Sequence, residues 1–455
     1  MPNKMLKDEQ SIIKQIILLA IPIIGTFLSQ KLIQVITTFM LGHINTNALA
    51  AGGLFITFYT LIIVISIGIF NAVNVFIARV IGTNQLNLIS KYVIQGCYIA
   101  IALSILIILG LWYAPHILFS IPEYYNIAPQ VLILSKASSF GVPGTLFYLV
   151  FKETLTALKL PKINFYVVIL SIPILIIMDY FIIFILKIDD NMKIMLVGFA
   201  NAIIEWFLFI GILCYCFISN KVKPIILKDI TFQLCLPTIK NILRLGIPTA
   251  MIFMLDVGMV LAASILTGYF GAVSLSAYQI SLQLGTIAYM FPMGISLAVT
   301  TLISHQFGTN NFTEIRKIFK NGINLGLIIA IVILLIYIFF GSYIASIFMD
   351  SNEANFNAVI HYATIFLIVA GATQLFDSIL AISNSTLRGL GDVMIPMYYC
   401  ILCYWLIGVS SMFILGFLLK LNALGIWLGL CLGIGCACIL TFIRAYKRCF
   451  SVTLT

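Results

Sequence analysis

The chain has 455 residues, of which 62% are hydrophobic and 9% are charged, and its formal net charge is +10. Soluble domains are roughly half apolar and a quarter charged, so this composition, with a mean hydropathy of +1.14, excludes a soluble globular protein. Apolar stretches such as "LIIVISIGIFNAV" are continuous rather than alternating, which excludes a β-barrel. The sequence therefore predicts an all-α polytopic membrane protein.

Taken in chain order, the apolar stretches predict about twelve membrane-spanning helices in two groups of six. Each stretch reaches the length of about 20 residues that a helix needs to cross the hydrocarbon core. The breaks between them are short and contain turn and helix-end residues, as in "GHINTN" and "KIDDN". The expected spans are 13–40, 48–78, 92–117, 129–157, 163–187 and 193–217, then 239–268, 275–304, 321–347, 357–386, 395–419 and 424–446.

One break is longer than the others and divides the chain near its middle. It is the segment "SNKVKPIILKDITFQLCLPTIK", which is basic and contains two prolines. We therefore expect a six-helix lobe at 1–218, a cytoplasmic linker at 219–238 and a second six-helix lobe at 239–455.

The placement of charge predicts the orientation in the membrane. The N-terminus and the even-numbered breaks carry most of the Lys and Arg residues, whereas the odd-numbered breaks carry only Lys187, Lys193 and Lys420. By the positive-inside rule, both termini are expected in the cytoplasm. The net charge is then a topology signal beside anionic lipid, and no nucleic-acid partner is expected.

The two halves contain an internal repeat. Gly-Thr-Asn at 82–84 recurs at 308–310, an offset of 226 positions, and the same offset pairs Pro22 with Pro248 without a gap. Six spans per half give both repeats the same orientation, which is typical of secondary transporters that work by alternating access. The Gly of each motif is expected to end the second helix of its lobe.

Four acidic residues within spans are the candidate coupling sites. The sequence has no G-x-x-x-x-G-K-[ST] phosphate loop, so an ion gradient rather than ATP is the expected energy source. An ionisable residue within a span costs roughly 2.5–3.5 kcal/mol on insertion scales, which makes function the first hypothesis for each. The alternative is a structural pair with Lys31 or Lys136, which also lie within spans. The acids are Asp179, Glu205, Asp256 and Asp377.

Two stretches resemble a known family. The segment "LSAYQISLQLGTIAYMFPMGISLAVTTLISHQFGTNN" (275–311), the element "STLRGLGDVMIP" (385–396) and the two six-span halves are similar to the multidrug and toxic-compound extrusion (MATE) transporters. The resemblance covers nearly the whole chain. It implies a two-lobed, twelve-helix exporter of polyaromatic, often cationic compounds that works by H⁺ or Na⁺ antiport.

The residue match mixes two branches of that family. Asp256 and Asp377 stand where the NorM-like branch has its acids in the seventh and tenth spans, and Gln279 matches the family glutamine of the eighth. Thr37 in "ITTFMLG" stands where the family usually has an aspartate. Asp179 and Glu205 resemble acids of the DinF-like branch, although Leu175 replaces the asparagine expected four residues before that aspartate.

These matches give the predicted roles. We expect Asp256 and Asp377 to couple transport to a proton or Na⁺, with Na⁺ at these two acids as the only metal. Because Thr37 is neutral, we expect Asp179 to be a first-lobe coupling site, with Lys31 as its partner, and Glu205 is a further coupling candidate in the same lobe. The candidate substrate contacts are Gln34, Thr37, Tyr278, Gln279 and Gln283, each of which could instead serve ordinary interhelical packing.

Other classes remain as alternatives. A flippase of lipid-linked precursors from the same superfamily is the nearest, and a basic, wide cavity would favour it. An enzyme is not expected, because the four histidines lie at scattered span ends without metal-binding spacing. We expect small-molecule organic cations and membrane lipids as partners, no cofactor beyond the coupling ion, a monomer, and location in a bacterial inner membrane.

Overall fold

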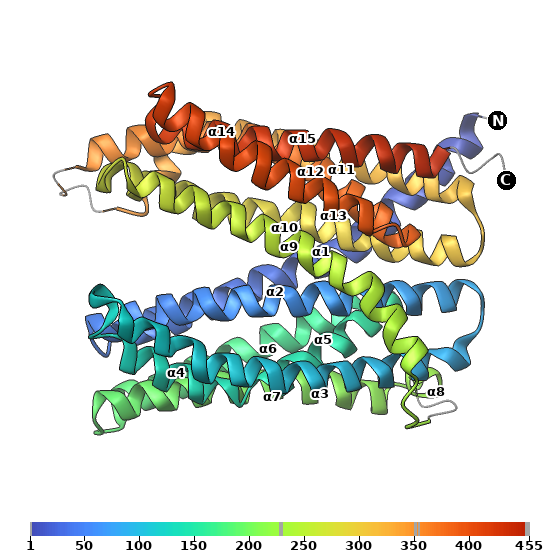
Figure 1. Ribbon diagram of the computed structural model, residues 1–455. Coiled ribbons are helices and arrows are strands. Elements are labelled where there is room, and N and C mark those ends of the chain that lie inside the picture. The colour runs from blue at the N-terminus through green and yellow to red at the C-terminus, as the bar shows by residue number, and fades with distance from the viewer. Residues whose placement is uncertain (1, 227–230, 350–352, 354, 451–455) are drawn as a thin grey trace. The chain divides into compact units, whose positions relative to one another are not determined.

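The structure is a computed structural model that describes residues 2–226, 231–349, 353 and 355–450. Within those ranges every regular element is a helix (Figure 1), and eleven helices are long and apolar enough to cross a membrane. The predicted all-α polytopic membrane fold is therefore confirmed.

The first half of the chain forms a run of helices joined by short turns. Long α-helices alternate with 3₁₀ turns (η1 to η3) and one π-helical segment (η4). Their bounds are α1 (Pro2–Gly42), α2 (Thr46–Gly82), η1 (Leu86–Leu88), α3 (Ile89–Tyr113), η2 (Ala114–Ser120), η3 (Pro122–Tyr124), α4 (Ala128–Ser139), α5 (Val142–Ala157), α6 (Pro161–Tyr180), η4 (Phe181–Ile185), α7 (Asp190–Ile218) and α8 (Lys223–Ile226).

The second half repeats this plan with longer helices. Its penultimate span is continuous from 394 to 418 but alternates between α-helical and π-helical segments (η5 and η6). The bounds are α9 (Leu236–Gly268), α10 (Ala272–Gly308), α11 (Phe312–Ser346), α12 (Phe356–Leu390), α13 (Met394–Cys400), η5 (Ile401–Val409), α14 (Ser410–Phe413), η6 (Ile414–Leu418) and α15 (Asn422–Phe450).

The expected span 129–157 is divided into α4 and α5, which is why it is absent from the eleven. Pro143 lies at the start of α5, where it has no N–H to donate and its ring crowds the preceding turn, so the helix restarts there. A Cβ on Gly141 would lie 2.8 Å from Cα of Ala202, so this break also lets α7 pack closely. The break thus sets the position of α7.

The described chain forms two compact units. The N-unit comprises residues 25–250, and the C-unit comprises residues 251–455 together with the start of the chain through Ile24. Helices α1 and α9 each pass from one unit to the other two residues beyond a proline, Pro22 in α1 and Pro248 in α9. The repeated proline therefore marks the same structural position in both halves.

The Gly-Thr-Asn repeat ends two helices of identical length. Helices α2 and α10 each have 37 residues. As expected, each helix ends at the glycine of its motif, Gly82 in α2 and Gly308 in α10. The residue in the left-handed conformation is the asparagine two positions later, Asn84 (φ 58°) and Asn310 (φ 55°). Asparagine tolerates this conformation better than most residues do, and its backbone N–H donates to a carbonyl of the last turn.

The core of the C-unit is aromatic in its centre and rich in glycine along α15. Tyr278 is fully buried, with its ring 5.3 Å from that of Trp427. Gly425, Gly429 and Gly433 lie four residues apart on α15, and a Cβ on any of them would collide with the backbone of the preceding span. This small-residue stripe lets two helices pack at backbone contact.

Candidate functional site

The C-unit contains a small cavity lined by both of its intramembrane acids. Asp256 of α9 and Asp377 of α12 line a space of about 30 Å³, together with Tyr289, Asn384, Arg388 and Tyr404. That volume suits a water molecule or a bare cation. A polyaromatic compound does not fit it in this conformation, so the cavity is an ion-sized site.

Helix periodicity explains why these side chains converge. Asp377, Asn384 and Arg388 are spaced by seven and four residues, so they lie on one face of α12. Helix α12 packs along α10, which carries Tyr289, and α15 covers it (Figure 1). Tyr404 comes from the π-helical segment η5, where the widened helix shifts side chains from the ordinary α-helical register.

Arg388 is the positively charged residue that lines this cavity. Its side chain is only 4% exposed, and its guanidinium carbon lies 5.2 Å from the ring centroid of Phe253. With both acids ionised, the three charged groups carry a net charge of −1. A single bound monovalent cation makes the group neutral, which is the arrangement that lowers the cost of burying charge in a membrane interior.

The N-unit contains a larger cavity that also has polar lining. It measures about 200 Å³ and is lined by α1, α2, α4, α5 and α7. Its acid is Glu205, which α7 presents beside α5 because Gly144 allows the two backbones to approach: a Cβ there would lie 3.0 Å from the N of Trp206. The other polar lining includes Gln30, Gln34, Thr37, Tyr59, Lys152 and Asn201.

Several polar groups in this N-unit cavity face one another. The hydroxyl of Thr37 donates to Oδ1 of Asn201 over 3.1 Å, and the hydroxyls of Tyr59 and Thr145 are 3.1 Å apart. The buried hydroxyl of Tyr148 has no hydrogen-bond partner among the described residues. The cavity therefore offers hydrogen-bonding groups to a polar or hydrated occupant.

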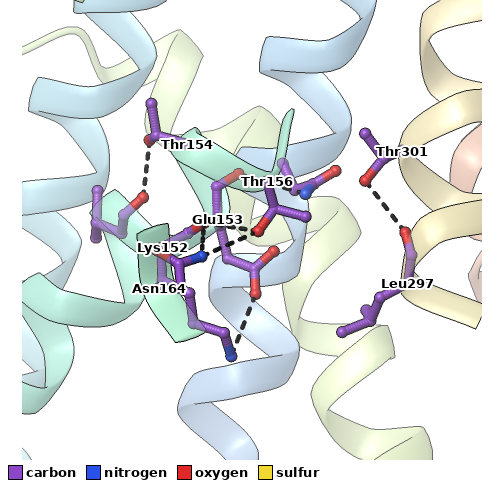
Figure 2. A network of polar contacts seen from close by, with 9 residues as sticks. Lys152, Glu153, Thr154, Thr156, Asn164, Leu297 and Thr301 are labelled. Atoms are coloured by element: carbon purple, nitrogen blue, oxygen red, sulfur yellow. Dashed lines mark hydrogen bonds and ion pairs between the residues drawn. The ribbon is translucent and has the colours of Figure 1, made fainter. Parts of the chain in front are cut away.

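A buried lysine and glutamate adjoin this cavity (Figure 2). Nζ of Lys152 lies 3.9 Å from Oε1 of Glu153 and 5.2 Å from the ring centroid of Phe27. Asn164 donates its amide to the backbone carbonyl of Lys152 over 3.2 Å, and the hydroxyl of Thr156 donates to the same carbonyl over 2.8 Å. These bonds fix the end of α5 against α6 and hold Lys152 at the cavity wall.

Asp179 is not part of either cavity. It is fully buried near the end of α6, and neither carboxylate oxygen has a hydrogen-bond partner among the described residues. The predicted partnership with Lys31 is therefore wrong as a hydrogen-bonded pair. The neighbouring Met178 and Ile182 belong to an apolar cluster, so Asp179 lies in a packed region rather than at an open site.

The predicted substrate contacts divide between the units. Gln34 and Thr37 line the N-unit cavity. Tyr278 is corrected from a ligand contact to a core residue, because it is fully buried and its hydroxyl donates to the carbonyl of Val260 over 3.2 Å. Gln279 is exposed and donates to the hydroxyl of Ser264, and Gln283 is partly exposed on the same helix.

Arg388 and Lys152 are the site residues that the sequence analysis missed. Both lie near the ends of expected spans, where basic residues are ordinary topology signals. The spacing of Arg388 from Asp377, eleven residues or three helical turns, is the signal that places the two on one face. For Lys152 the adjacent Glu153 in an otherwise apolar helix is the corresponding signal.

Comparison with known proteins gives the family. The MatE family model matches residues 22–181 and 248–414. A protein of Pseudomonas putida described as "Probable multidrug resistance protein NorM" is 27% identical over 446 residues, covering 94% of this chain and 93% of its own length. "Multidrug resistance protein MdtK" of Yersinia pseudotuberculosis is 26% identical, covering 95% and 94%.

Solved structures show the same fold. The eukaryotic MATE transporter AtDTX14 matches with a TM-score of 0.83 and 17% identity, over 97% of this chain and all of that one. A MOP superfamily transporter from Pyrococcus furiosus matches with a TM-score of 0.85 and 17% identity, over 98% and 97%. With the family model covering most of the chain, the resemblance noted in the sequence is confirmed: this protein belongs to the MatE family of multidrug and toxic-compound extrusion transporters.

Proposed function

We propose that the protein exports organic, cationic polyaromatic compounds across a bacterial inner membrane by H⁺ or Na⁺ antiport. The observation that carries this proposal is the pair Asp256 and Asp377, which share one ion-sized cavity with Arg388. Relatives described as multidrug resistance proteins support the choice of substrate class. The distribution of Lys and Arg supports an orientation with both termini in the cytoplasm.

The charge of the C-unit cavity supplies the coupling. Empty, its two carboxylates and one guanidinium favour a cation, and an occupied cavity is neutral. The ion changes the relative free energies of the two facing states only by as much as it binds them differently. Movement of α9 or α12 between states would separate or join Asp256 and Asp377, and that change of distance makes the ion affinity state-dependent.

The N-unit cavity supplies the contacts to the transported compound. Glu205 attracts the positive charge, while Gln34, Thr37 and Tyr59 offer hydrogen bonds. Its volume of about 200 Å³ is below the 300–1,000 Å³ of ligand pockets, so it receives one part of a drug-sized molecule in this conformation. We assign the acid of the N-unit to Glu205 rather than Asp179, because Glu205 lines the cavity.

The test is dye accumulation in bacteria that lack their own efflux pumps. Cells expressing the protein should accumulate less of a fluorescent cationic dye than cells with empty vector. A protonophore should restore accumulation if the ion is H⁺, and a sodium ionophore should restore it if the ion is Na⁺. Unchanged dye accumulation, together with rescue of a strain that lacks a lipid-precursor flippase, would instead support the flippase alternative.

A further inference from the structure

The N-unit contains another cavity, separate from the one that Glu205 lines. It measures about 310 Å³ and is lined almost wholly by carbon and sulfur atoms. Its walls include Val93 and Cys97 on α3, Cys216 and Phe217 on α7, and Phe232 from the segment that leads to α9. Among the residues that the structure describes, none that lines it carries a carboxylate, the group that would select an organic cation.

The segment that closes this cavity is fastened to α3. Gln95, which is fully buried, donates its amide to the carbonyl of Gln233 over 2.9 Å and accepts from the backbone N–H of Cys235 over 2.9 Å. The hydroxyl of Tyr98 donates to the carbonyl of Phe232 over 2.6 Å. These three bonds satisfy backbone groups that have no helical partner, as a segment at the edge of a membrane requires.

The outer side of the same segment is apolar and open. Phe232 is 75% exposed, and Leu234 and Leu236 are also exposed. In a membrane protein, large exposed apolar side chains beside the ends of spans contact lipid rather than water. We therefore expect lipid acyl chains beside the opening of the cavity.

Basic side chains surround the same place. Lys221 is exposed on the stretch between α7 and α8, Lys223 is exposed as the first residue of α8, and α8 packs against both α3 and α7. Lys91 lies beside Ser90, which lines the cavity. Hydrogen bonds from Thr238, together with the Lys91 ammonium, hold the pKa of the Cys235 thiol below its usual value.

We propose that this cavity binds an anionic phospholipid, with an acyl chain between α3 and α7 and the headgroup phosphate held by Lys91, Lys221 and Lys223. The apolar lining selects a hydrocarbon chain, and the basic rim selects negative charge in the headgroup. The bound lipid would hold the segment that runs into α9, the helix of Asp256. The site is distinct from both cavities described above, so it stands whether or not the transport proposal does.

The acyl-chain test is photolabelling of the full chain in phosphatidylethanolamine nanodiscs. A trace of phosphatidylglycerol with a photoactivatable group on its acyl chain is activated, and labelled peptides are identified by mass spectrometry. We expect labels on 90–101 and 213–217. Cys216→Trp, which fills the cavity, should reduce labelling about tenfold. Cys214→Trp is the matched control, because Cys214 is exposed on the same helix and does not line the cavity.

Cys97→Trp is a second filling variant in case Cys216→Trp does not fold, and size-exclusion chromatography checks each variant. The proposal would be overturned if the two filling variants, Cys216→Trp and Cys97→Trp, were labelled as strongly as the control Cys214→Trp. The probe would then be reacting from the lipid around the protein and not from inside the cavity. Labelling of the same peptides by a photoactivatable cationic dye, with competition by unlabelled dye, would also overturn it and identify a substrate site.

The headgroup test compares anionic with neutral probes. Wild-type protein should incorporate the phosphatidylglycerol probe more than a phosphatidylcholine probe with the same acyl chain. Replacing Lys221 and Lys223 together by Gln should bring the two probes close to equal. The control replaces Lys187 and Lys193, which lie at the other end of the preceding helix, and should keep the preference. Equal incorporation of both probes by wild-type protein would refute selection of an anionic lipid.

Discussion

At the scale of single residues, Asp256, Asp377 and Arg388 bring two negative charges and one positive charge to one cavity. Two ionised carboxylates in a space of about 30 Å³ repel each other, and a guanidinium in the same wall reduces that repulsion. If the cavity binds the coupling ion as proposed, the arginine should weaken that binding and so allow release on the other side of the membrane.

Replacing Arg388 by Gln should therefore tighten ion binding and slow turnover. The empty cavity would carry a charge of −2 instead of −1, so the half-saturating concentration of the coupling ion should fall about tenfold and the maximal efflux rate should fall with it. Arg388→Lys keeps the charge and should stay near wild type in ion affinity. Dye efflux measured against ion concentration checks this. An unchanged half-saturating concentration in Arg388→Gln would show that Arg388 does not act on the ion.

Glu205 and Asp179 should behave differently although both are acids within N-unit spans. Glu205→Gln removes the negative charge that lines the cavity and should weaken binding of a cationic dye about tenfold. Asp179→Asn changes a residue outside the cavity and should leave dye affinity within about a factor of two. Fluorescence titration of purified protein measures both. If Asp179→Asn weakened dye binding more than Glu205→Gln did, Asp179 rather than Glu205 would be the N-unit acid that contacts the dye.

The sequence predicted part of this site for a physical reason. Acids in apolar spans are conspicuous, so Asp256, Asp377 and Glu205 could be identified as candidates from their positions in the sequence, as Asp179 was. Which acid faces a cavity depends on how each helix is rotated, and packing sets that rotation, so Asp179 and Glu205 could not be distinguished. Arg388 and Lys152 were missed because a basic residue near a span end has the same pattern whether it faces water or a buried acid.

At the scale of elements, several helices are followed by a residue in the left-handed conformation, and the residue type differs from one helix to the next. Asn84 and Asn310 follow the ends of α2 and α10 in the left-handed conformation, and Gly391 caps α12 in the same conformation. Lys159 follows α5 with φ 61°, although lysine has no side-chain group that favours this conformation. The strain at this position comes from the Cβ of Lys159 itself.

Lys159→Gly should therefore stabilise the protein. Glycine adopts positive φ without the Cβ clash, so a gain of about 1 kcal/mol is expected. The matched control is Lys320→Gly, an exposed lysine in the interior of α11, where glycine should cost about 1 kcal/mol. Thermal unfolding in detergent, followed by tryptophan fluorescence, compares the two. A lower melting temperature in Lys159→Gly than in wild type would contradict the assignment of strain to this residue.

Element prediction from sequence was good where periodicity is strong and poor where backbone geometry changes. Apolar length predicted the spans, and the structure shows that α2 and α10 follow the 226-residue offset at both ends. The π-helical segments of the span 394–418 have no signal in the composition, whereas the division of α4 from α5 has one, Pro143, which a prediction from apolar length does not use. Both arise from local backbone choices, a proline at the start of α5 and widened turns around Tyr404.

At the scale of the whole molecule, duplication gave two units that carry different chemistry. The C-unit has an ion-sized cavity lined by two acids, and the N-unit has a larger cavity in which Glu205 is the lining acid. Thr37, at the position where the family usually has an aspartate, donates a hydrogen bond to Asn201. We infer that coupling is concentrated in the C-unit and that the N-unit is free to contact the transported compound.

The most direct test of this division is dye movement in proteoliposomes under a pH gradient or a Na⁺ gradient imposed separately. Wild-type protein should move a fluorescent cationic dye under one of the two gradients. Asp377→Asn should abolish that movement, whereas Asp190→Asn, at an exposed position at the start of α7, should retain it. Gradient-driven movement by Asp377→Asn at the wild-type rate would contradict coupling in the C-unit.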